Sequence, residues 1–261
     1  MNKNFTGKII SKALPPFFAV ILIIIVWQIL STAGAMPSYM MPSPVKVWCA
    51  LKEDFLILCK HSLTSIYEAL TGLAIGIAIS FIIAIAMDSC TVIRNAVYPL
   101  LVVSQTIPSI AIAPLLLLWF GYGVLPKIIL IVITTFFPIT ISLLDGFASV
   151  DKDSLKLMKS MGANSIQQLI HIKLPASLSH FFAGLKISVS YSIVGAVISE
   201  WLGGTRGLGV YMTRVRKSFA YDKMFAVIFF IAAVSLLLIM LVSVIKWLVM
   251  PWERNTKNEK K

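Results

Sequence analysis

Long apolar segments dominate this chain, and they leave few folds open to it. Only 13% of its 261 residues are charged and 58% are hydrophobic, whereas about a quarter of the residues in a soluble domain are charged. A run of about 18 apolar residues can cross the hydrocarbon core of a bilayer as a helix. We therefore predict an all-α integral membrane protein with six transmembrane helices, within Leu14–Thr32, Thr64–Met87, Ala96–Phe120, Val124–Leu144, Phe181–Ile198 and Met224–Met250.

The first apolar segment has two interpretations. Lys3, Lys8 and Lys12 precede it, and the small residues at Ser31–Ala35 resemble the cleavage site of a secretory signal peptide. Its apolar core exceeds the roughly 15 residues of a usual signal peptide, which favours a retained helix. Lysines before the first span favour a cytoplasmic N-terminus, and six spans then put both termini in the cytoplasm.

The net charge of +12 bears on the class of partner. Basic chains often bind nucleic acid, but here the Lys and Arg residues stand beside the apolar segments, and no nucleic-acid-binding motif is evident. Positive charges that flank spans face anionic lipid. We therefore expect a lipid bilayer as their partner and no nucleic acid.

Cysteine and histidine spacing indicates neither a metal site nor a catalytic site. The cysteines fit no zinc or redox motif, and no serine or cysteine pairs with a base within one span. A disulfide between the first two cysteines is a disfavoured alternative. The residues concerned are Cys49, Cys59, Cys90, His61, His171 and His180.

Three prolines interrupt the third apolar segment, at positions 99, 108 and 114. Proline frees backbone carbonyls, which is tolerated in a membrane where neighbouring helices or a cavity satisfy them. The segment is either a kinked, buried helix or a broken helix that lines a pathway, and both remain open. The polar pathway candidates beside the break at Pro108 are Ser104, Gln105 and Ser109, although such groups more often bond neighbouring backbone.

Two further residue patterns are ambiguous. Gly72 and Gly76 form a GxxxG pattern, which we interpret as helix packing inside one protomer, with a dimer interface as the alternative. Lys186 near one end of the fifth span is expected to reach the headgroups with its ammonium group, with a substrate contact as the alternative.

The stretch 155–178 (LKLMKSMGANSIQQLIHIKLPASL) lies between spans and predicts two short helices joined at a turn. Gly162 can take the left-handed conformation that ends the first helix. Ser165 and Gln168 form an S-x-x-Q capping box for the second helix, and Pro175 ends it or starts the next span. Exposed basic and apolar faces suit either a helix lying on lipid or a docking element for a soluble partner.

This stretch resembles the cytoplasmic signature of permeases of bacterial ABC importers, EAA-x3-G-x9-I-x-LP. Gly162 is followed after nine residues by Ile172-Lys173-Leu174-Pro175, but the EAA positions fall on Lys156, Leu157 and Met158. The acidic residue is therefore absent, and Lys156 in its place predicts an acidic rim on the partner's groove.

Four other stretches resemble the nitrate, sulfonate, taurine and thiamine-precursor subgroup of these permeases. They are PSP at Pro42–Pro44, TIPSIAIAPLLLLWFGYGVLPKI at Thr106–Ile128, LLDGFASVD at Leu143–Asp151 and SEWLGGTRGLG at Ser199–Gly209. Glu200 matches an acid of the last pattern. We expect it to face water or a basic residue such as Arg206, with a transport role as the alternative.

The resemblance implies the type I (MetI-like) importer permease fold with a cytoplasmic coupling helix, in the bacterial cell membrane. The implied partners are cytoplasmic ABC ATPase subunits, an extracytoplasmic substrate-binding protein and a second copy of the permease. The implied ATPase-coupling residues are Lys156, Leu157, Met158, Lys159, Gly162, Ala163, Ile172, Leu174 and Pro175.

No phosphate-binding loop GxxxxGK[ST] occurs in the chain. We therefore expect no cofactor in it, with ATP and magnesium bound by the partner ATPase, and no enzymatic activity of its own. We expect an N-terminal region (1–63), a core permease domain (64–250, with coupling loop 150–176) and a cytoplasmic tail (251–261).

The substrate is expected to be a small nutrient. The stretch Tyr211–Phe225 most resembles the thiamine-precursor branch, which implies a pyrimidine, with sulfonate, taurine or nitrate as alternatives. A secondary transporter is the rival class, but it would more often show paired intramembrane acids or inverted repeats, and neither is evident here.

Overall fold

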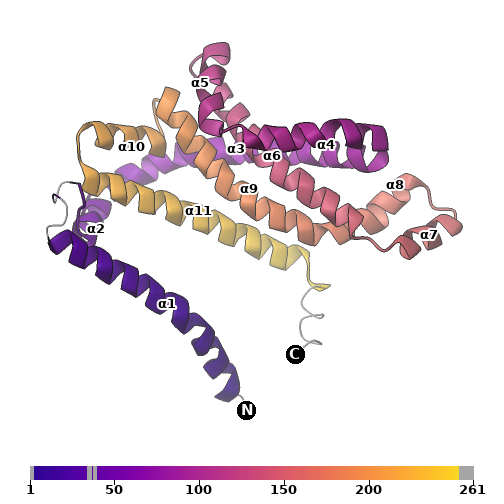
Figure 1. The fold of residues 1–261 in the computed structure, drawn as a ribbon, viewed down its shortest axis with the longest axis horizontal. Helices are drawn as coiled ribbons and strands as arrows, with labels where there is room; N and C mark the ends of the chain where they lie inside the picture. Colours follow the sequence, from indigo (N-terminus) through magenta and orange to yellow (C-terminus); the bar gives the residue numbers. More distant parts are fainter. Residues whose placement is uncertain (1–2, 34–36, 38–39, 253–261) are drawn as a thin grey trace. The chain divides into compact units, whose positions relative to one another are not determined.

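The computed structural model describes residues 3–33, 37 and 40–252, in which all regular structure is helical (Figure 1). In chain order the helices are α1 (Lys3–Thr32), α2 (Pro44–Glu53), α3 (Phe55–Ser89), α4 (Thr91–Thr106), α5 (Ser109–Phe120), α6 (Leu125–Ala148), α7 (Lys152–Ser160), α8 (Ser165–Gln168), the π-helical turn η1 (Leu169–Lys173), α9 (Leu174–Gly203), α10 (Leu208–Lys217) and α11 (Tyr221–Val249). The expected cytoplasmic tail after position 252 lies outside the described residues.

Four helical stretches in the described residues are long and apolar enough to cross a membrane. They are Phe55–Ser89, Leu125–Ala148, Ser165–Gly203 and Tyr221–Val249. The bent pair α4 and α5 is a fifth if it counts as one span. The first predicted span lies in α1, whose described apolar part, Phe18–Thr32, is shorter. The helices α3 and α9 extend beyond the predicted apolar segments, because the flanking residues continue the same helix.

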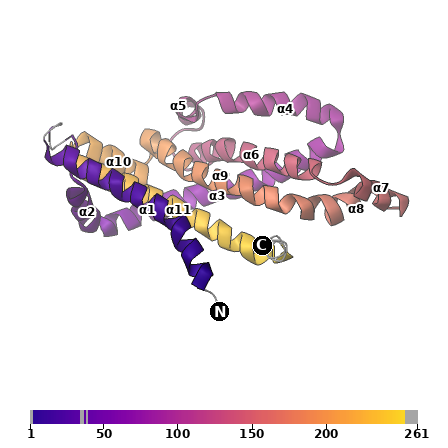
Figure 2. The ribbon, with the colours of Figure 1, turned by 60° about the horizontal axis from the view of Figure 1, so that its bottom comes forward.

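The segment with three prolines is broken at the middle one. Pro108 is the N-cap residue of α5, and the axes of α4 and α5 meet at 99°. Pro99 and Pro114 lie inside the two helices without ending them. The break that the second interpretation requires is therefore confirmed, and the lining of a pathway stays a prediction. Figure 2 shows α4 and α5 as separate helices; α5 packs against α6 and α9, whereas α4 contacts α6 less extensively.

The chain divides into two compact units. The first consists of Met1–Cys59 with Met212–Phe230, and the second of Lys60–Tyr211 with Ile231–Lys261. The second unit contains every residue that the sequence analysis singles out for coupling or for the pathway.

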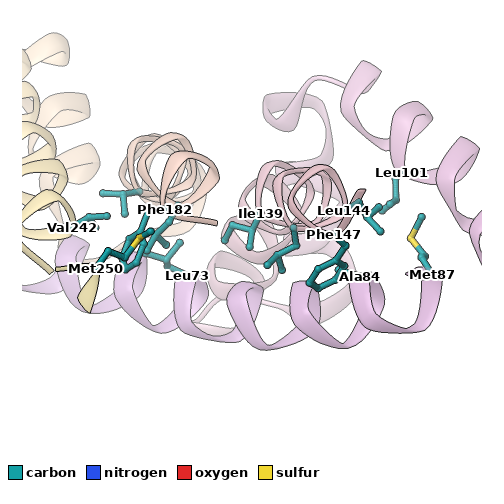
Figure 3. Close-up of a cluster of buried hydrophobic side chains, with 13 residues drawn as sticks. Leu73, Ala84, Met87, Leu101, Ile139, Leu144, Phe147, Phe182, Val242 and Met250 are labelled. Carbon is teal, nitrogen blue, oxygen red and sulfur yellow. The ribbon is translucent and has the colours of Figure 1, made fainter. Parts of the chain in front are cut away.

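An apolar cluster formed by α3, α4, α6, α9 and α11 is the core of the second unit (Figure 3). Its buried members come from segments far apart in the sequence, because each helix contributes one apolar face. They are Leu73, Ala84, Met87, Leu101, Ile139, Leu143, Leu144, Phe147, Phe182, Leu185, Val189, Val242 and Met250.

The GxxxG pattern on α3 packs against α6 within the protomer. A Cβ atom on Gly72 would lie 2.5 Å from Ile131 Cγ2, and one on Gly76 would lie 2.5 Å from Thr135 Oγ1. No side chain fits into so close a contact without displacing its neighbour, because protein interiors are densely packed. The favoured interpretation, packing inside the protomer, is confirmed.

The first unit has a short amphipathic helix that the apolar segments did not predict. Ser43 caps α2 by accepting a hydrogen bond from the Lys46 N–H, and Pro44 is its first residue. Both features are usual at helix starts. Within this unit Lys223 Nζ lies 2.9 Å from Asp54 Oδ2, and Trp27 stacks on Phe229.

All three cysteines lie in the described residues, and none of them is in a disulfide. Among the described residues no three His, Cys, Asp or Glu side chains are placed to hold a metal ion.

Candidate functional site

The loop between α6 and α9 folds into the two short helices that its sequence predicts. Asp151 caps α7, and its carboxylate accepts hydrogen bonds from the N–H groups of Asp153 (3.2 Å) and Ser154 (3.1 Å). The Asp153 N–H, the Ser154 hydroxyl and the Ser154 N–H together hold the pKa of Asp151 below its usual value of 3.8, because hydrogen bonds to a carboxylate favour its charged form.

Gly162 ends the first helix, as predicted. Its φ of +86° lies in the left-handed region that favours glycine. The N–H of Ala163 bonds to the Met158 carbonyl at 3.0 Å, which satisfies a carbonyl that the helix leaves without a partner.

The capping box of the second helix lies one residue earlier than predicted. Asn164 Oδ1 accepts from the Gln167 N–H, and Gln167 Oε1 accepts from the Asn164 N–H, both at 2.8 Å. The prediction of Ser165 and Gln168 is therefore wrong, because the extended Asn164 occupies the N-cap and Ser165 is the first helical residue.

The loop exposes apolar side chains that no described part of the chain covers. Leu157, Met161, Ile166 and Ile170 are all more than half exposed. A groove of about 350 Å³ runs between α7 and the second arm of the loop, lined by Met158, Met161, Gly162, Ala163, Gln167 and His171.

The charged and signature residues of the loop differ in exposure. Lys156 and Lys159 are exposed, and Lys156 Nζ lies 2.9 Å from Asp153 Oδ1 on the same helix. Ile172 and Leu174 are half-buried where the loop joins α9, and Pro175 is exposed.

A second feature is a cavity of about 250 Å³ at the break between α4 and α5. Gln105, Pro108 and Ser109 line it, as do Ser104 and residues of α6 and α9. The Ser104 hydroxyl donates to the Leu101 carbonyl at 2.7 Å, so that this candidate bonds its own helix. The lining carries no charged side chain: Ser104, Gln105, Ile107, Pro108, Ser109, Ile112, Ile133, Thr134, Tyr191, Val194 and Gly195.

A third feature is a buried polar network around Glu200. The carboxyl group accepts hydrogen bonds from the Ser65 hydroxyl and the Gly209 N–H, both at 2.6 Å. Ser65 Oγ accepts in turn from the Leu208 N–H at 2.9 Å. Glu200 is 1% exposed, and therefore the expectation that it faces water or pairs with Arg206 is wrong.

The network ties α3 and α9 to the loop between α9 and α10. His61 Nδ1 accepts from the Gly207 N–H at 3.1 Å, which requires that this ring nitrogen carries no proton. Gly207 has φ +127°, and a Cβ atom there would overlap the Glu200 carboxyl. Only glycine therefore allows this approach of the loop to Glu200.

The pair Glu68 and Lys127 was missed by the sequence analysis. Lys127 Nζ lies 2.6 Å from Glu68 Oε1, with both side chains at least 94% buried. Both groups interact electrostatically with Glu200. The sequence analysis did not predict that these three charged side chains come together. The sequence did contain a signal for this pair: Glu68 and Lys127 each lie inside a predicted apolar segment. Buried charges need partners, so two lone opposite charges in two spans favour an ion pair.

Comparison with known proteins places the chain among membrane components of transport systems. The family described as "Binding-protein-dependent transport system inner membrane component" matches residues 76–254. A probable ABC transporter permease protein of Haemophilus influenzae is 36% identical over 227 residues, which cover 87% of this chain and 93% of that protein.

A formylaminopyrimidine transport permease protein of Halalkalibacterium halodurans is 32% identical over 244 residues, covering 93% of this chain and 97% of that one. The crystal structure of an amino acid ABC transporter superposes with a TM-score of 0.60 over 77% of this chain and 96% of that one. Its sequence identity is 16%, so it supports the fold alone.

Proposed function

Because the chain belongs to the family of inner-membrane components of binding-protein-dependent transport systems, we propose that it is the subunit through which an ATP-driven importer moves a small nutrient across the bacterial membrane. It is a non-catalytic permease subunit. Alternating access to the cavity at the α4–α5 break would carry the nutrient across, with energy from a separate ATPase. Both termini and the loop between α6 and α9 would face the cytoplasm.

The single observation that carries the coupling role is the exposed apolar surface of this loop. Leu157, Met161 and Ile166 are 64%, 79% and 65% exposed, although burying such side chains is worth about 1.5–3 kcal/mol each. We propose that they enter a groove on an ABC ATPase, together with the neighbouring Met158 and Ala163. The ATPase holds ATP and magnesium.

The lysines of α7 would meet an acidic rim of that groove. Lys156 stands at the glutamate position of the EAA signature, and its ammonium group pairs with the exposed Asp153 on its own helix. Replacing the acidic residues of the rim by basic ones should therefore weaken binding of the ATPase to the permease. The effect should be largest at low salt, because salt screens exposed charges. A neutral or basic rim on the natural partner would contradict this point.

Gly162→Trp tests the docking site. A Cβ atom on Gly162 meets nothing within 4 Å, so the indole would stand on the outer surface of the turn and obstruct a partner. Gly121→Trp is the matched control, because Gly121 also has a positive φ (+73°) and open space around its Cβ position. We expect G162W to lose the co-purifying ATPase and uptake, and G121W to keep the ATPase. Uptake by G162W at the normal rate would refute the proposal.

A second copy of the permease and an extracytoplasmic binding protein complete the proposed transporter. One chain supplies half of a pathway, and apolar side chains of α5 such as Leu118 (79% exposed) and Trp119 (67% exposed) are available for a partner copy. Native mass spectrometry of the detergent-extracted complex should give two permease copies and two ATPase copies. One permease copy per complex would contradict the homodimer.

A thiamine-precursor pyrimidine is the proposed substrate. The formylaminopyrimidine permease relative supports it, and so does the uncharged lining of the cavity at Pro108. An aromatic heterocycle needs hydrogen-bonding amides and hydroxyls, whereas a sulfonate, taurine or nitrate anion favours a cationic group. Binding of each compound to the purified binding protein tests this. Tight binding of a sulfonate, taurine or nitrate without pyrimidine binding would refute the substrate while leaving the permease role intact.

A further inference from the structure

The second arm of the coupling loop continues into a transmembrane helix without a break. The helix α8, the turn η1 and α9 form one helical stretch, Ser165–Gly203, which is apolar enough to span the membrane (Figure 1). The loop and α9 are therefore joined by continuous helical backbone through η1.

The turn η1 is widened because a proline follows it. Pro175 has no N–H to give to the His171 carbonyl, and its ring would clash with that carbonyl in a regular α-helix. The Leu174 N–H instead bonds five residues back, to the Leu169 carbonyl. Such π-helical turns are local weak points of a helix, where it bends with little loss of hydrogen bonding.

An ion pair ties this weak point to the end of another helix. Lys173, the last residue of η1, places Nζ 2.7 Å from Oδ2 of Asp88, which is next to the last residue of α3. Both side chains are 20% exposed. Opposite charges attract more strongly in such a partly buried position than on an open surface.

Directly after the turn, α9 rests on α6 at small residues. A Cβ atom on Gly146 of α6 would lie 2.6 Å from Ser177 Cβ, and one on Gly184 of α9 would lie 2.5 Å from Ser142 Oγ. These contacts bring the two backbones close together. The close contacts of Gly146 and Gly184 fix the point where α9 crosses α6, and the end of α9 can tilt about this point. The ion pair between Asp88 and Lys173 limits this tilt relative to α3.

We propose that Asp88 and Lys173 are positioning residues for energy coupling: their ion pair braces the π turn, so that movement of the coupling loop reaches α3 as well as α9. Without the brace, the turn would absorb part of the movement by bending. This inference rests on the proposed docking of an ATPase at the loop.

The test measures substrate transported per ATP hydrolysed by the assembled transporter in proteoliposomes. Asp88→Asn and Lys173→Met remove one charge each, and the swap D88K/K173D restores an ion pair of opposite direction. Lys223→Met is the matched control, since Lys223 forms an ion pair of similar distance and exposure with Asp54. We expect each single variant to lower the transport-to-ATP ratio at least about five-fold, which is the lower end of the usual range of coupling factors. The swap should bring the ratio back to within about two-fold of the wild type.

Hydrogen exchange of the permease alone in nanodiscs tests the brace without any ATPase. Amides of 169–174 should exchange faster in D88N and K173M than in the wild type, and at the wild-type rate in the swap and in K223M. Unchanged transport-to-ATP ratios in the single variants would overturn the proposal, as would a folded swap variant that stays uncoupled. If the wild type itself binds no ATPase, the proposed function fails, whereas the exchange result still decides whether the brace exists.

Discussion

The buried network around Glu200 makes the hydroxyl of Ser65 the sharpest target for a test of the structure. This hydroxyl donates to Glu200 Oε1 at 2.6 Å and accepts from the Leu208 N–H at 2.9 Å. Ser65→Ala removes one non-hydrogen atom and takes away the hydrogen bond that Glu200 Oε1 and the Leu208 N–H each make with the hydroxyl, while both groups stay buried. Each orphaned group costs about 1–3 kcal/mol, so the loop attachment should weaken by about 2–6 kcal/mol.

Hydrogen exchange of the Leu208 and Gly209 amides measures this loss directly. Local opening governs their exchange, and since every 1.4 kcal/mol is a factor of ten, the rate should rise at least about 30-fold in S65A. Ser192→Ala is the matched control: Ser192 is as fully buried, but its hydroxyl donates to the Val189 carbonyl of its own helix at 2.8 Å. That variant should leave both amides unchanged.

Two results would refute the reasoning behind this prediction. Exchange at Leu208 and Gly209 within about two-fold of wild type in S65A would mean that the network does not hold the loop, because the smallest expected cost already exceeds that factor. Equal acceleration in S192A would mean that any lost buried hydroxyl loosens the protein, and the network would then have no special role.

Three further variants test other contacts. Lys127→Met should destabilise the detergent-purified protein by about 3–5 kcal/mol, because Glu68 is left buried without its cation. Thermal unfolding should show that the double variant E68M/K127M recovers most of this loss. A single variant as stable as the wild type would contradict the ion pair between Glu68 and Lys127. Gly76→Val should lower thermal stability markedly, because its side chain would clash with Thr135. If the variant protomer instead kept its stability but no longer formed a dimer, the glycines of α3 would lie at a dimer interface. Because the pKa of Asp151 is lowered, its capping hydrogen bonds should stabilise α7 above pH 3.8, and this stabilisation should fade as the pH falls below that value. Asp151→Asn should abolish the pH dependence of amide protection in α7. The same pH profile in this variant as in the wild type would exclude a stabilising cap at Asp151.

Several features could be predicted from the sequence because local physics decides them. Apolar length alone identified the four spanning helices and the bent pair of the described residues. Proline chemistry placed the break in the third segment at one of three positions. The left-handed glycine at Gly162 followed from its place after a helical pattern, since few other residues take that conformation readily. The one-residue error at Asn164 arose because neighbouring Asn and Ser are almost equally good caps, so the sequence could not choose between them.

What the sequence determined by itself is the class of the molecule and the outline of its coupling loop. Apolar runs, helix caps and the spacing from Gly162 to Pro175 act within a few residues of one another. They do not depend on which helices become neighbours.

Only the tertiary structure decided the partners of the charged residues. Glu200 lies 135 positions from Ser65, and Lys173 lies 85 positions from Asp88. Ionisable groups inside a membrane protein need a partner, but the helix packing determines which one. For this reason Glu200 is an anchor of a loop in the structure, where the sequence alone indicated an acid facing water.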